Sequence, residues 1–212
     1  MKNTFVHLRV HSNFSLAEGM LSFDYLTNFC KQNVQPAIAI TDTSNMFGVL
    51  EFSIQMVSSG IQPIIGIQVN IAESSENEID VGEVVLIAKN EIGYKNLLNI
   101  TSKLDSNINY EKFVKWEKLE AHSDGLILLT GGIEKGFLGY PASLGNIKLV
   151  NSRIKLLKGL FDDNLYVELQ RHGLKDQIIS EKNLILAADD FNLPLVATND
   201  CFFESPKKFN AH

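Results

Sequence analysis

Three features are scarce in this sequence, and each scarcity argues against a class of protein. The 212 residues include only two cysteines, Cys30 and Cys201, and no CxxC motif, so a disulfide framework is excluded and a reducing compartment fits. No apolar run approaches the length of a membrane-spanning helix, and the first residues lead into a predicted strand without the apolar core of a signal peptide. We therefore expect a cytoplasmic protein with no membrane partner.

Positive charge is the third scarce feature. The chain has 25 acidic residues against 19 Lys and Arg, which gives a net charge of −6. Because a protein that holds a phosphate backbone needs clustered Lys and Arg, this stretch is not expected to hold nucleic acid by itself. The length and the apolar fraction of 45% are those of a soluble globular protein with one substantial domain or two small ones.

Short apolar segments alternate with helical patterns along the whole chain. Strands are predicted at residues 5–12, 37–40, 63–71, 84–88, 126–130, 165–169 and 194–198, and helices at about 22–35, 49–60, 92–104, 148–161 and 177–191, with a short one within 105–122. Such alternation is typical of βα units and a mostly parallel sheet. The strands are continuous apolar runs, so both faces of the sheet should be covered. We predict the α/β class, with a closed barrel favoured over an open sheet.

The first predicted strand carries an unusual row of polar side chains. Side chains alternate between the two faces of a strand, so the apolar residues at even positions should share one face and His7, Arg9 and His11 the other. Histidine is the commonest metal ligand among protein side chains, so two histidines on one face could belong to a metal site. This strand alone leaves open the alternative that the row is the solvated side of an edge strand.

Polar side chains also stand at or near the ends of later strands. Asp42 follows the second strand, Gln68 lies near the end of the third, Glu168 closes another with His172 beyond it, and Asp200 closes the last. In parallel α/β proteins the functional site lies at the carboxyl ends of the strands. Polar groups from five strands are therefore predicted to converge on one rim, which favours a functional role for the histidines of the first strand.

Seven segments together resemble a known family. HLRVHSNFSLAEG, AIAITDTSNMFG, GIQPIIGIQVNIA, IAKNEIGYKNL, LILLTGG, YVELQRHG and PLVATNDCFF follow the order and spacing of the PHP domain that opens the alpha subunit of bacterial DNA polymerase III. AKNEIGYKNL and VATND are similar to the replicative polymerase branch rather than to PHP domains in general. The resemblance implies one PHP domain over residues 1–212, at the N-terminus of a much longer chain. It also implies a distorted (β/α)₇ barrel with up to three metal ions at the carboxyl ends of the strands.

The sequence departs from the metal-binding pattern of that family at four positions. Arg9 replaces a ligand histidine of the first strand, Thr43 a histidine after Asp42, Gln68 a bridging carboxylate, and Phe202 a histidine near the end. Glu83 stands where an imidazole is often found. The positions that complete the implied cluster are His7, which precedes the ligands, His11, Glu18, Asp42, Glu168, His172 and Asp200.

These departures weaken metal binding for definite chemical reasons. Arg cannot be deprotonated, so it offers no lone pair and places a positive charge where a cation would bind. Thr and Phe are weak ligands or none, and Gln lacks the charge of a carboxylate. We therefore predict a vestigial metal site with no tightly bound cofactor, in which Arg9 pairs with Asp200 or Glu18.

The resemblance also implies that this domain and the later domains of the longer chain have different functions. Polymerisation with Mg²⁺ and the DNA contacts would belong to later domains, so no catalytic residue is expected in this fragment. The domain itself would be a scaffold that docks the proofreading exonuclease subunit and other replicase subunits. The alternative is a domain that still binds Zn or Mn through His11, Glu18, His172 and Asp200 and acts as a phosphoesterase, pyrophosphatase or 3′–5′ exonuclease. A free-standing histidinol-phosphatase-like enzyme conflicts with the segment AKNEIGYKNL.

Overall fold

The structure is a computed structural model that describes residues 5–73, 80–106, 112–205 and 208. The elements follow the chain in the order α1 (Phe23–Gln32), β1 (Ala37–Ile40), α2 (Val49–Ser58), β2 (Gln62–Glu73), β3 (Asp80–Ala88), α3 (Glu91–Ser102), β4 (Asp105–Ser106), β5 (Lys112–Lys115), α4 (Trp116–Ala121), β6 (Leu126–Leu129), α5 (Gly139–Ser143), α6 (Ile147–Phe161), the 3₁₀ helix η1 (Asp162–Asn164), β7 (Leu165–Leu169), α7 (Lys175–Asp190) and β8 (Leu195–Ala197). Among the described residues, no helix is both long enough and apolar enough to cross a membrane.

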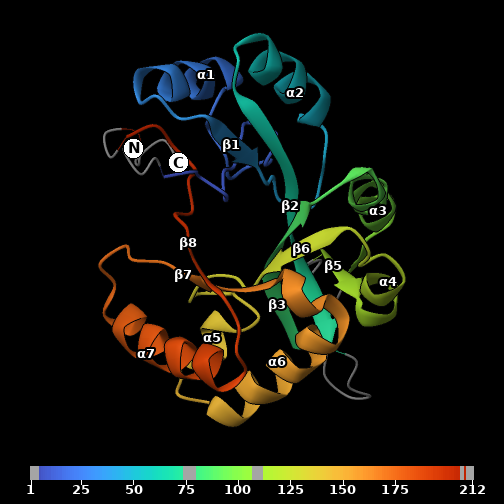
Figure 1. Ribbon diagram of the computed structural model, residues 1–212, viewed down its shortest axis with the longest axis vertical. Coiled ribbons are helices and arrows are strands. Elements are labelled where there is room, and N and C mark those ends of the chain that lie inside the picture. The colour runs from blue at the N-terminus through green and yellow to red at the C-terminus, as the bar shows by residue number, and fades with distance from the viewer. Residues whose placement is uncertain (1–4, 74–79, 107–111, 206–207, 209–212) are drawn as a thin grey trace.

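A ring of strands surrounds the centre of the molecule (Figure 1). Neighbouring strands pair in the order β1, β2, β3, β6, β7 and β8. Residues 7–11 close the gap between β8 and β1. On the β1 side the amide of Ala39 donates to the carbonyl of His7 at 2.9 Å, and on the other side the amide of His11 donates to the carbonyl of Cys201, also at 2.9 Å. This ring of seven segments confirms the predicted α/β class and the distorted (β/α)₇ barrel.

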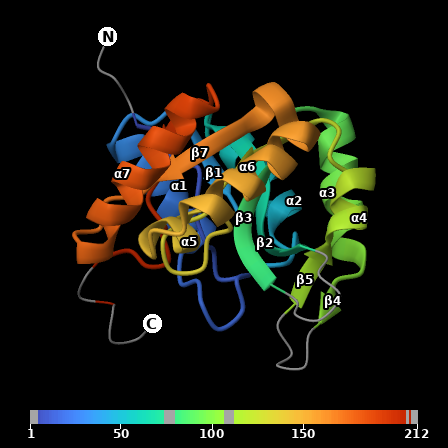
Figure 2. The ribbon, with the colours of Figure 1, turned by 90° about the horizontal axis from the view of Figure 1, so that it is seen from below.

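The barrel is distorted because β3 runs antiparallel to both of its neighbours, β2 and β6. All the other pairs in the ring are parallel, as the alternating pattern predicts. Strands β4 and β5 lie outside the ring, where β5 extends the far end of β2. Helices lie on the outside of the barrel, with α1 and α2 at one end of the view in Figure 1 and α5, α6 and α7 at the other, and Figure 2 shows α3 and α4 on the side opposite α7.

The prediction of a regular strand at residues 5–12 is wrong. Within residues 5–12 only Val10 and Ser12 form isolated bridges, and neighbouring side chains explain why a ladder does not form. The amide of Val10 donates to the hydroxyl of Thr41 at 2.9 Å, and the amide of Ser12 donates to the carboxylate of Asp42 at 2.6 Å. Side-chain oxygens therefore take bonds that backbone carbonyls accept in a ladder.

The apolar face predicted for this segment is also wrong. Val10 packs beneath α1 and α2 in a cluster with Phe52, whereas Leu8 packs against a separate cluster that contains Val85. The irregular backbone turns the two apolar side chains in different directions. As a result Arg9, which follows Leu8 directly, reaches the same interior as Leu8.

The inward-facing residues of the strands form an apolar floor and, at one end of the barrel, a polar group, because residues two positions apart share a strand face. The floor consists of Val85, Ile87 and Leu129, with the partly buried residues Leu8, Ile64, Ile127, Tyr166 and Val196 packed against them. Glu83 lies two positions from Val85 on β3, and Glu168 lies two positions from Tyr166 on β7, so each carboxylate shares a strand face with a floor residue. The strands therefore present the polar side chains at one end of the barrel.

Candidate functional site

Arg9 occupies the centre of the polar end of the barrel, and 1% of its surface is exposed. Its Nε donates to Oε1 of Gln68 at 2.9 Å and lies 3.0 Å from Oδ1 of Asp200. Its two terminal nitrogens reach Oε1 of Glu168, at 3.4 Å, and Oε1 of Glu83. One guanidinium thus joins groups from β2, β3, β7 and the segment after β8. We call Arg9 and these four partners, together with His11, the polar rim.

Glu168 is fixed by its own partners as well as by Arg9. Its Oε2 accepts the backbone amide of Gly131 at 2.9 Å, and its Oε1 accepts the hydroxyl of Thr198 and the amide of Gln170, the latter at 3.1 Å. The carboxylate is 1% exposed, and so many donors offset the cost of burying its charge. Glu168 therefore links β6, β7 and β8 at the level of Arg9.

His11 connects the other side of the rim. Its Nε2 donates to Oδ1 of Asp200 at 3.0 Å, and its ring stacks on Phe202 with 4.1 Å between centroids and an angle of 8°. Its Nδ1 faces the hydroxyls of Ser15 at 3.2 Å and Thr43 at 3.4 Å. Both ring nitrogens of this buried imidazole are therefore in use within the protein.

Ser15, His11 and Asp200 form a row that resembles the triad of a serine hydrolase, but its surroundings argue against that chemistry. Ser15 is fully buried, and its hydroxyl donates to Oδ1 of Asp42 at 2.8 Å. The same oxygen accepts the amide of Thr43 at 3.1 Å. A nucleophilic serine must give its proton to the histidine and must reach the substrate. Ser15 meets neither requirement and instead fixes the loop after His11.

Electrostatics agree with the geometry. Burial alone would lower the pKa of Arg9, but the charges of Glu168, Glu83 and Asp200 outweigh it and hold that pKa above its usual value. Burial alone would raise the pKa of Asp200, but the hydrogen bond from His11 and the charge of Arg9 hold it below its usual value. Burial, with the charge of Asp200, raises the pKa of the Cys201 thiol to about 11. Arg9 and Asp200 are therefore a charged pair at neutral pH.

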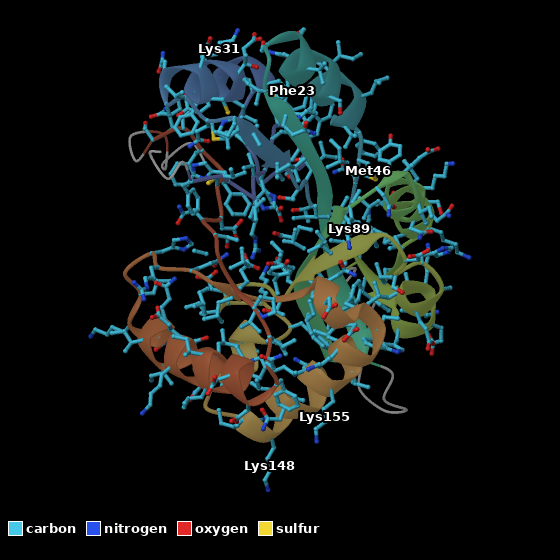
Figure 3. The ribbon with its side chains drawn as sticks, in the orientation of Figure 1. Phe23, Lys31, Met46, Lys89, Lys148 and Lys155 are labelled. Atoms are coloured by element: carbon cyan, nitrogen blue, oxygen red, sulfur yellow. The ribbon has the colours of Figure 1, made fainter. Side chains whose placement is uncertain are left out.

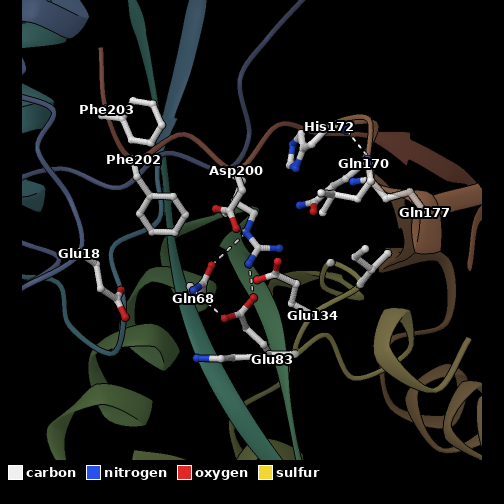
Figure 4. A pocket seen from close by; sticks show the side chains of 15 residues that line it. Glu18, Gln68, Glu83, Glu134, Gln170, His172, Gln177, Asp200, Phe202 and Phe203 are labelled. Carbon is white, nitrogen blue, oxygen red and sulfur yellow. Dashed lines mark hydrogen bonds and ion pairs between the residues drawn. The ribbon is translucent and has the colours of Figure 1, made fainter. Parts of the chain in front are cut away.

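A cavity of about 660 Å³ opens on the polar rim (Figure 4). In this view Gln68, Glu83 and Asp200 lie together near the centre, with Glu18 and Phe202 on one side and His172 and Gln170 on the other. The cavity is lined by Arg9, Glu18, Gln68, Glu83, Gly132, Ile133, Glu134, Lys135, Gln170, His172, Leu174, Gln177, Asp200, Phe202 and Phe203.

The structure gathers most of the side chains that the sequence singled out, but in several separate groups. Asp42 is not part of the Arg9 network, because its carboxylate accepts bonds from Ser12 and Ser15. Glu18 lies at the edge of the cavity and accepts the hydroxyl of Thr43 at 2.5 Å. The predicted ion pair between Arg9 and Asp200 is present. Glu18, the other predicted partner of Arg9, bonds to Thr43 instead.

The two outer histidines are placed differently from the rim. His7 packs edge-on against Phe5 and Phe29, and its Nδ1 lies 3.5 Å from the sulfur of Cys201. Burial lowers the pKa of His7, as expected for an imidazole among aromatic rings. His172 is exposed on the loop before α7 and lines the cavity. In the described part of the chain, neither ring forms a hydrogen bond or an ion pair with Arg9.

Glu83 is the rim residue that the sequence signalled least clearly. It bonds to Arg9, and its Oε2 accepts the amide of Gln68 at 2.8 Å. Its position near the beginning of an antiparallel strand explains the difficulty, since the prediction looked for polar residues at the carboxyl ends of parallel strands. Only the reversed direction of β3 brings its early residues to the same end of the barrel.

The donor atoms of the rim do not fit a metal cluster. Every carboxylate near the centre already contacts Arg9, and His11 has both nitrogens engaged. Within the described part of the chain, no group of three or more His, Cys, Asp or Glu side chains has the arrangement that could hold a metal ion. A guanidinium among three carboxylates instead supplies a positive charge from the protein itself.

Comparisons with family models and with curated proteins indicate the same family. A family model described as the PHP domain matches residues 7–172. The chain is 38% identical over 214 residues to DNA polymerase III subunit alpha of Caulobacter vibrioides, with 98% of this chain and 19% of that protein covered. It is 32% identical over 225 residues to the protein of the same name from Aquifex aeolicus, with 100% of this chain and 19% of that protein covered. The chain thus spans 19% of the length of these curated relatives.

Two solved structures have the same fold. One is a crystal structure assigned to a metal-dependent phosphoesterase from Bifidobacterium adolescentis, with a TM-score of 0.60, 11% identity, and 95% of this chain and 89% of that chain covered. The other is an amidohydrolase from Chromobacterium violaceum, with a TM-score of 0.58, 12% identity, and 93% and 87% covered. At these identities the similarity concerns the fold alone.

Proposed function

Because the chain belongs to the PHP domain family, we propose that it serves as the PHP domain of a replicative DNA polymerase subunit and that its polar rim is structural rather than catalytic. The identity to two proteins named DNA polymerase III subunit alpha supports the first part of this proposal. DNA polymerisation with Mg²⁺ and the DNA contacts of the polymerase active site then belong to regions outside these 212 residues, and the subunit works in the cytoplasm with the other replicase subunits.

The observation that carries the structural role is the position of Arg9. A cation that is part of the chain sits among Glu83, Glu168 and Asp200, which would otherwise repel one another. The same guanidinium ties four segments of the barrel wall, one of which is the irregular segment 7–11. The rim would therefore hold the barrel closed without a resident metal.

The test is to restore the ligands that the family pattern implies. Thr43 forms a bridge with Gln68, Gln68 bonds to Arg9, and Phe202 stacks on His11, so the four departures lie around one place. The variant Arg9→His, Thr43→His, Gln68→Glu, Phe202→His should bind Zn²⁺ or Mn²⁺, measured by calorimetry and elemental analysis. Arg9→His alone is the control and should bind little, because several ligands must act together. A folded fourfold variant that binds no metal would overturn the assignment of these positions.

A second part of the proposal is that the domain docks another protein, which the family resemblance identifies as the proofreading exonuclease subunit. The supporting observation is α2, which is apolar on two faces. Val49, Phe52 and Met56 pack into the core, while Leu50, Ile54 and Val57 are 72%, 63% and 65% exposed. We call these three exposed residues the α2 stripe. A row of apolar side chains on the solvent side of a helix is a candidate surface for contact with another protein.

Docking can be tested with a variant of the α2 stripe. Leu50→Ser with Ile54→Ser should abolish co-elution of the chain with the purified exonuclease subunit. Ile178→Ser on α7 is the matched control, since Ile178 is 76% exposed but lies on another helix. Equal binding by the stripe variant and the wild-type chain would remove α2 from the proposal.

The alternative function is a metal-dependent hydrolase of phosphoesters, pyrophosphate or DNA 3′ ends. It is favoured by one observation, the cavity in which Glu18, His172 and Asp200 face the same space. Purified chain with Mn²⁺ or Zn²⁺ and bis(p-nitrophenyl) phosphate should give no turnover above an Asp200→Asn control under the structural proposal. Turnover that requires both added metal and Asp200 would replace that proposal with the hydrolase.

A further inference from the structure

Two surface hollows meet beside the polar rim and form one groove. The first has a volume of about 560 Å³ and the second about 650 Å³. They share Ser44, Asn45, Phe47 and Lys112, so Phe47 stands at the point where they join. Leu16, Lys135 and Tyr140 line the first hollow, and Leu98 and Lys103 are among the residues that line the second.

Phe47 is held in an exposed position by a well-bonded loop. Phe47 is 72% exposed, yet its backbone amide donates to Oδ1 of Asn45 at 3.0 Å. Asn45 is 8% exposed, and its Nδ2 donates to the carbonyls of Phe14 at 2.9 Å and Thr43 at 3.0 Å. An exposed aromatic ring on a fixed backbone loses little conformational entropy when a flat partner stacks on it.

A second aromatic residue and three lysines accompany Phe47 along the groove. Tyr140, at the first turn of α5, is 49% exposed and lines the first hollow. Lys103, Lys112 and Lys135 are exposed, and among the residues that the structure describes none of them forms a salt bridge. The three ammonium groups are spread from one end of the groove to the other.

The backbone of each lysine is tied to a structural element. The carbonyl of Lys103 accepts the ammonium of Lys118 at 2.5 Å, and the carbonyl of Lys112 accepts the amide of Asn70 at 3.3 Å. The carbonyl of Lys135 accepts the amide of Glu83 at 2.8 Å. The lysines therefore start from fixed points, although their long side chains keep their freedom.

We propose that this groove binds single-stranded nucleic acid, with bases stacked on Phe47 and Tyr140 and phosphates near Lys103 and Lys112. Exposed aromatic rings combined with a line of cations are the usual features of a sequence-tolerant single-strand site. A duplex would keep its bases stacked internally and could not use the two rings. The proposal is independent of the metal state of the rim.

Charge sets the direction and the strength of this binding. Glu18, Glu134 and Lys135 all lie where the first hollow meets the cavity of the polar rim, so carboxylates accompany that lysine, and Glu83 and Asp200 lie beyond them. Phosphates are repelled at that end, so the strand should extend from Tyr140 past Phe47 toward Lys103. The net charge of the chain, −6, opposes any polyanion, so binding should be weak and should depend strongly on salt.

The test is fluorescence anisotropy of the 212-residue chain with a labelled oligo-dT about twelve nucleotides long at about 50 mM salt. Phe47→Ala should weaken binding about fivefold or more. Lys112→Glu should weaken it further and lower the dependence on salt. Lys155→Glu, on the distant helix α6 (Figure 3), and Leu50→Ser, on the α2 stripe, are controls that should leave Kd within about twofold.

The outcomes separate this proposal from its rivals. Saturable binding that is lost in Phe47→Ala and kept in both controls supports the groove. Absence of saturable binding at low salt overturns it, as does equal weakening by Lys155→Glu, which would indicate a general charge effect. A circular dichroism spectrum checks that Phe47→Ala is folded, and Phe47→Tyr, which keeps the ring, should restore the wild-type affinity. If Phe47→Tyr remains as weak as Phe47→Ala, stacking is refuted.

Discussion

The polar rim and the α2 stripe invert the usual distribution of side chains in opposite ways. The rim buries an arginine, a histidine and carboxylates, and these groups contact one another. The α2 stripe exposes Leu50, Ile54 and Val57, and nothing in the described chain covers them. A buried polar group that has its partners stabilises its own fold, whereas an exposed apolar row gains only when something else covers it. The comparison assigns stability to the rim and association to α2.

The largest effect should come from removing the centre of the rim. Arg9→Ala leaves Glu83, Glu168 and Asp200 buried without their cation, which typically costs about 3–5 kcal/mol. In a chain of this size that loss corresponds to a fall in Tm of roughly 10 °C. Arg9→Lys should recover only part of it, because a point charge cannot replace a planar fork of donors. Differential scanning calorimetry measures both, and an Arg9→Ala variant as stable as the wild-type chain would show that the rim carries no stability.

A smaller, pH-dependent effect should follow from Asp200→Asn. The pKa of Asp200 is lower in the folded state than in the unfolded chain, so its ionised form stabilises the fold above its unfolded pKa of about 4. That contribution is lost as the pH falls through the folded pKa. Asp200→Asn should therefore cost about 1–3 kcal/mol at pH 7, and the difference from wild type should shrink as the pH falls below about 4.

Urea unfolding at a series of pH values gives this difference directly. Asp124→Asn is a suitable control, since Asp124 lies on a turn between α4 and β6, away from the rim. A gap between wild type and Asp200→Asn that stays constant down to pH 3 would mean that the carboxylate charge of Asp200 does not contribute.

The stack of Phe202 on His11 should make a smaller contribution. Phe202→Leu keeps an apolar side chain but removes the parallel ring, and it should cost about 1 kcal/mol. The same change should alter the chemical shifts of the His11 ring in an NMR spectrum, because the aromatic ring lies 4.1 Å away. Unchanged shifts would place the two rings apart in solution.

The smallest effect on stability should come from the α2 stripe. Leu50→Ser should change the free energy of unfolding by less than about 0.5 kcal/mol, because Leu50 is 72% exposed. Phe52→Ala, on the buried face of the same helix, should cost about 3–5 kcal/mol. Thermal unfolding of the two variants compares the faces. A large loss with Leu50→Ser would show that the stripe packs within the chain and is not free for a partner.

Much of this architecture could be predicted from local sequence patterns. The apolar runs that became β1, β6 and β7 have the right length and flanks, and Ser22 caps α1 as its residue type and position indicate. The short helix α5 was missed because its five residues include a glycine and a proline and show no helical period. Local patterns identify elements whose own residues favour them.

At the polar rim, contacts between distant parts of the chain limited what the sequence could predict. The charge and residue type of Arg9 indicated an ion pair with a carboxylate, and Asp200 is one of its partners. The contacts with Glu83 and Glu168 depend on β3 running in the reverse direction and on the irregular path of residues 7–11. Neither feature has a local signature, since strand direction is decided by connections and packing over the whole barrel.

The central claim, that Arg9 takes the place of bound cations, is tested most directly by the metal content of the purified chain. The chain is dialysed with Zn²⁺ and Mn²⁺, then against metal-free buffer, and measured by elemental analysis. We predict well under one metal ion per chain, because the carboxylates of the rim contact Arg9. One or more ions retained per chain, and lost in an Asp200→Asn variant, would contradict the account.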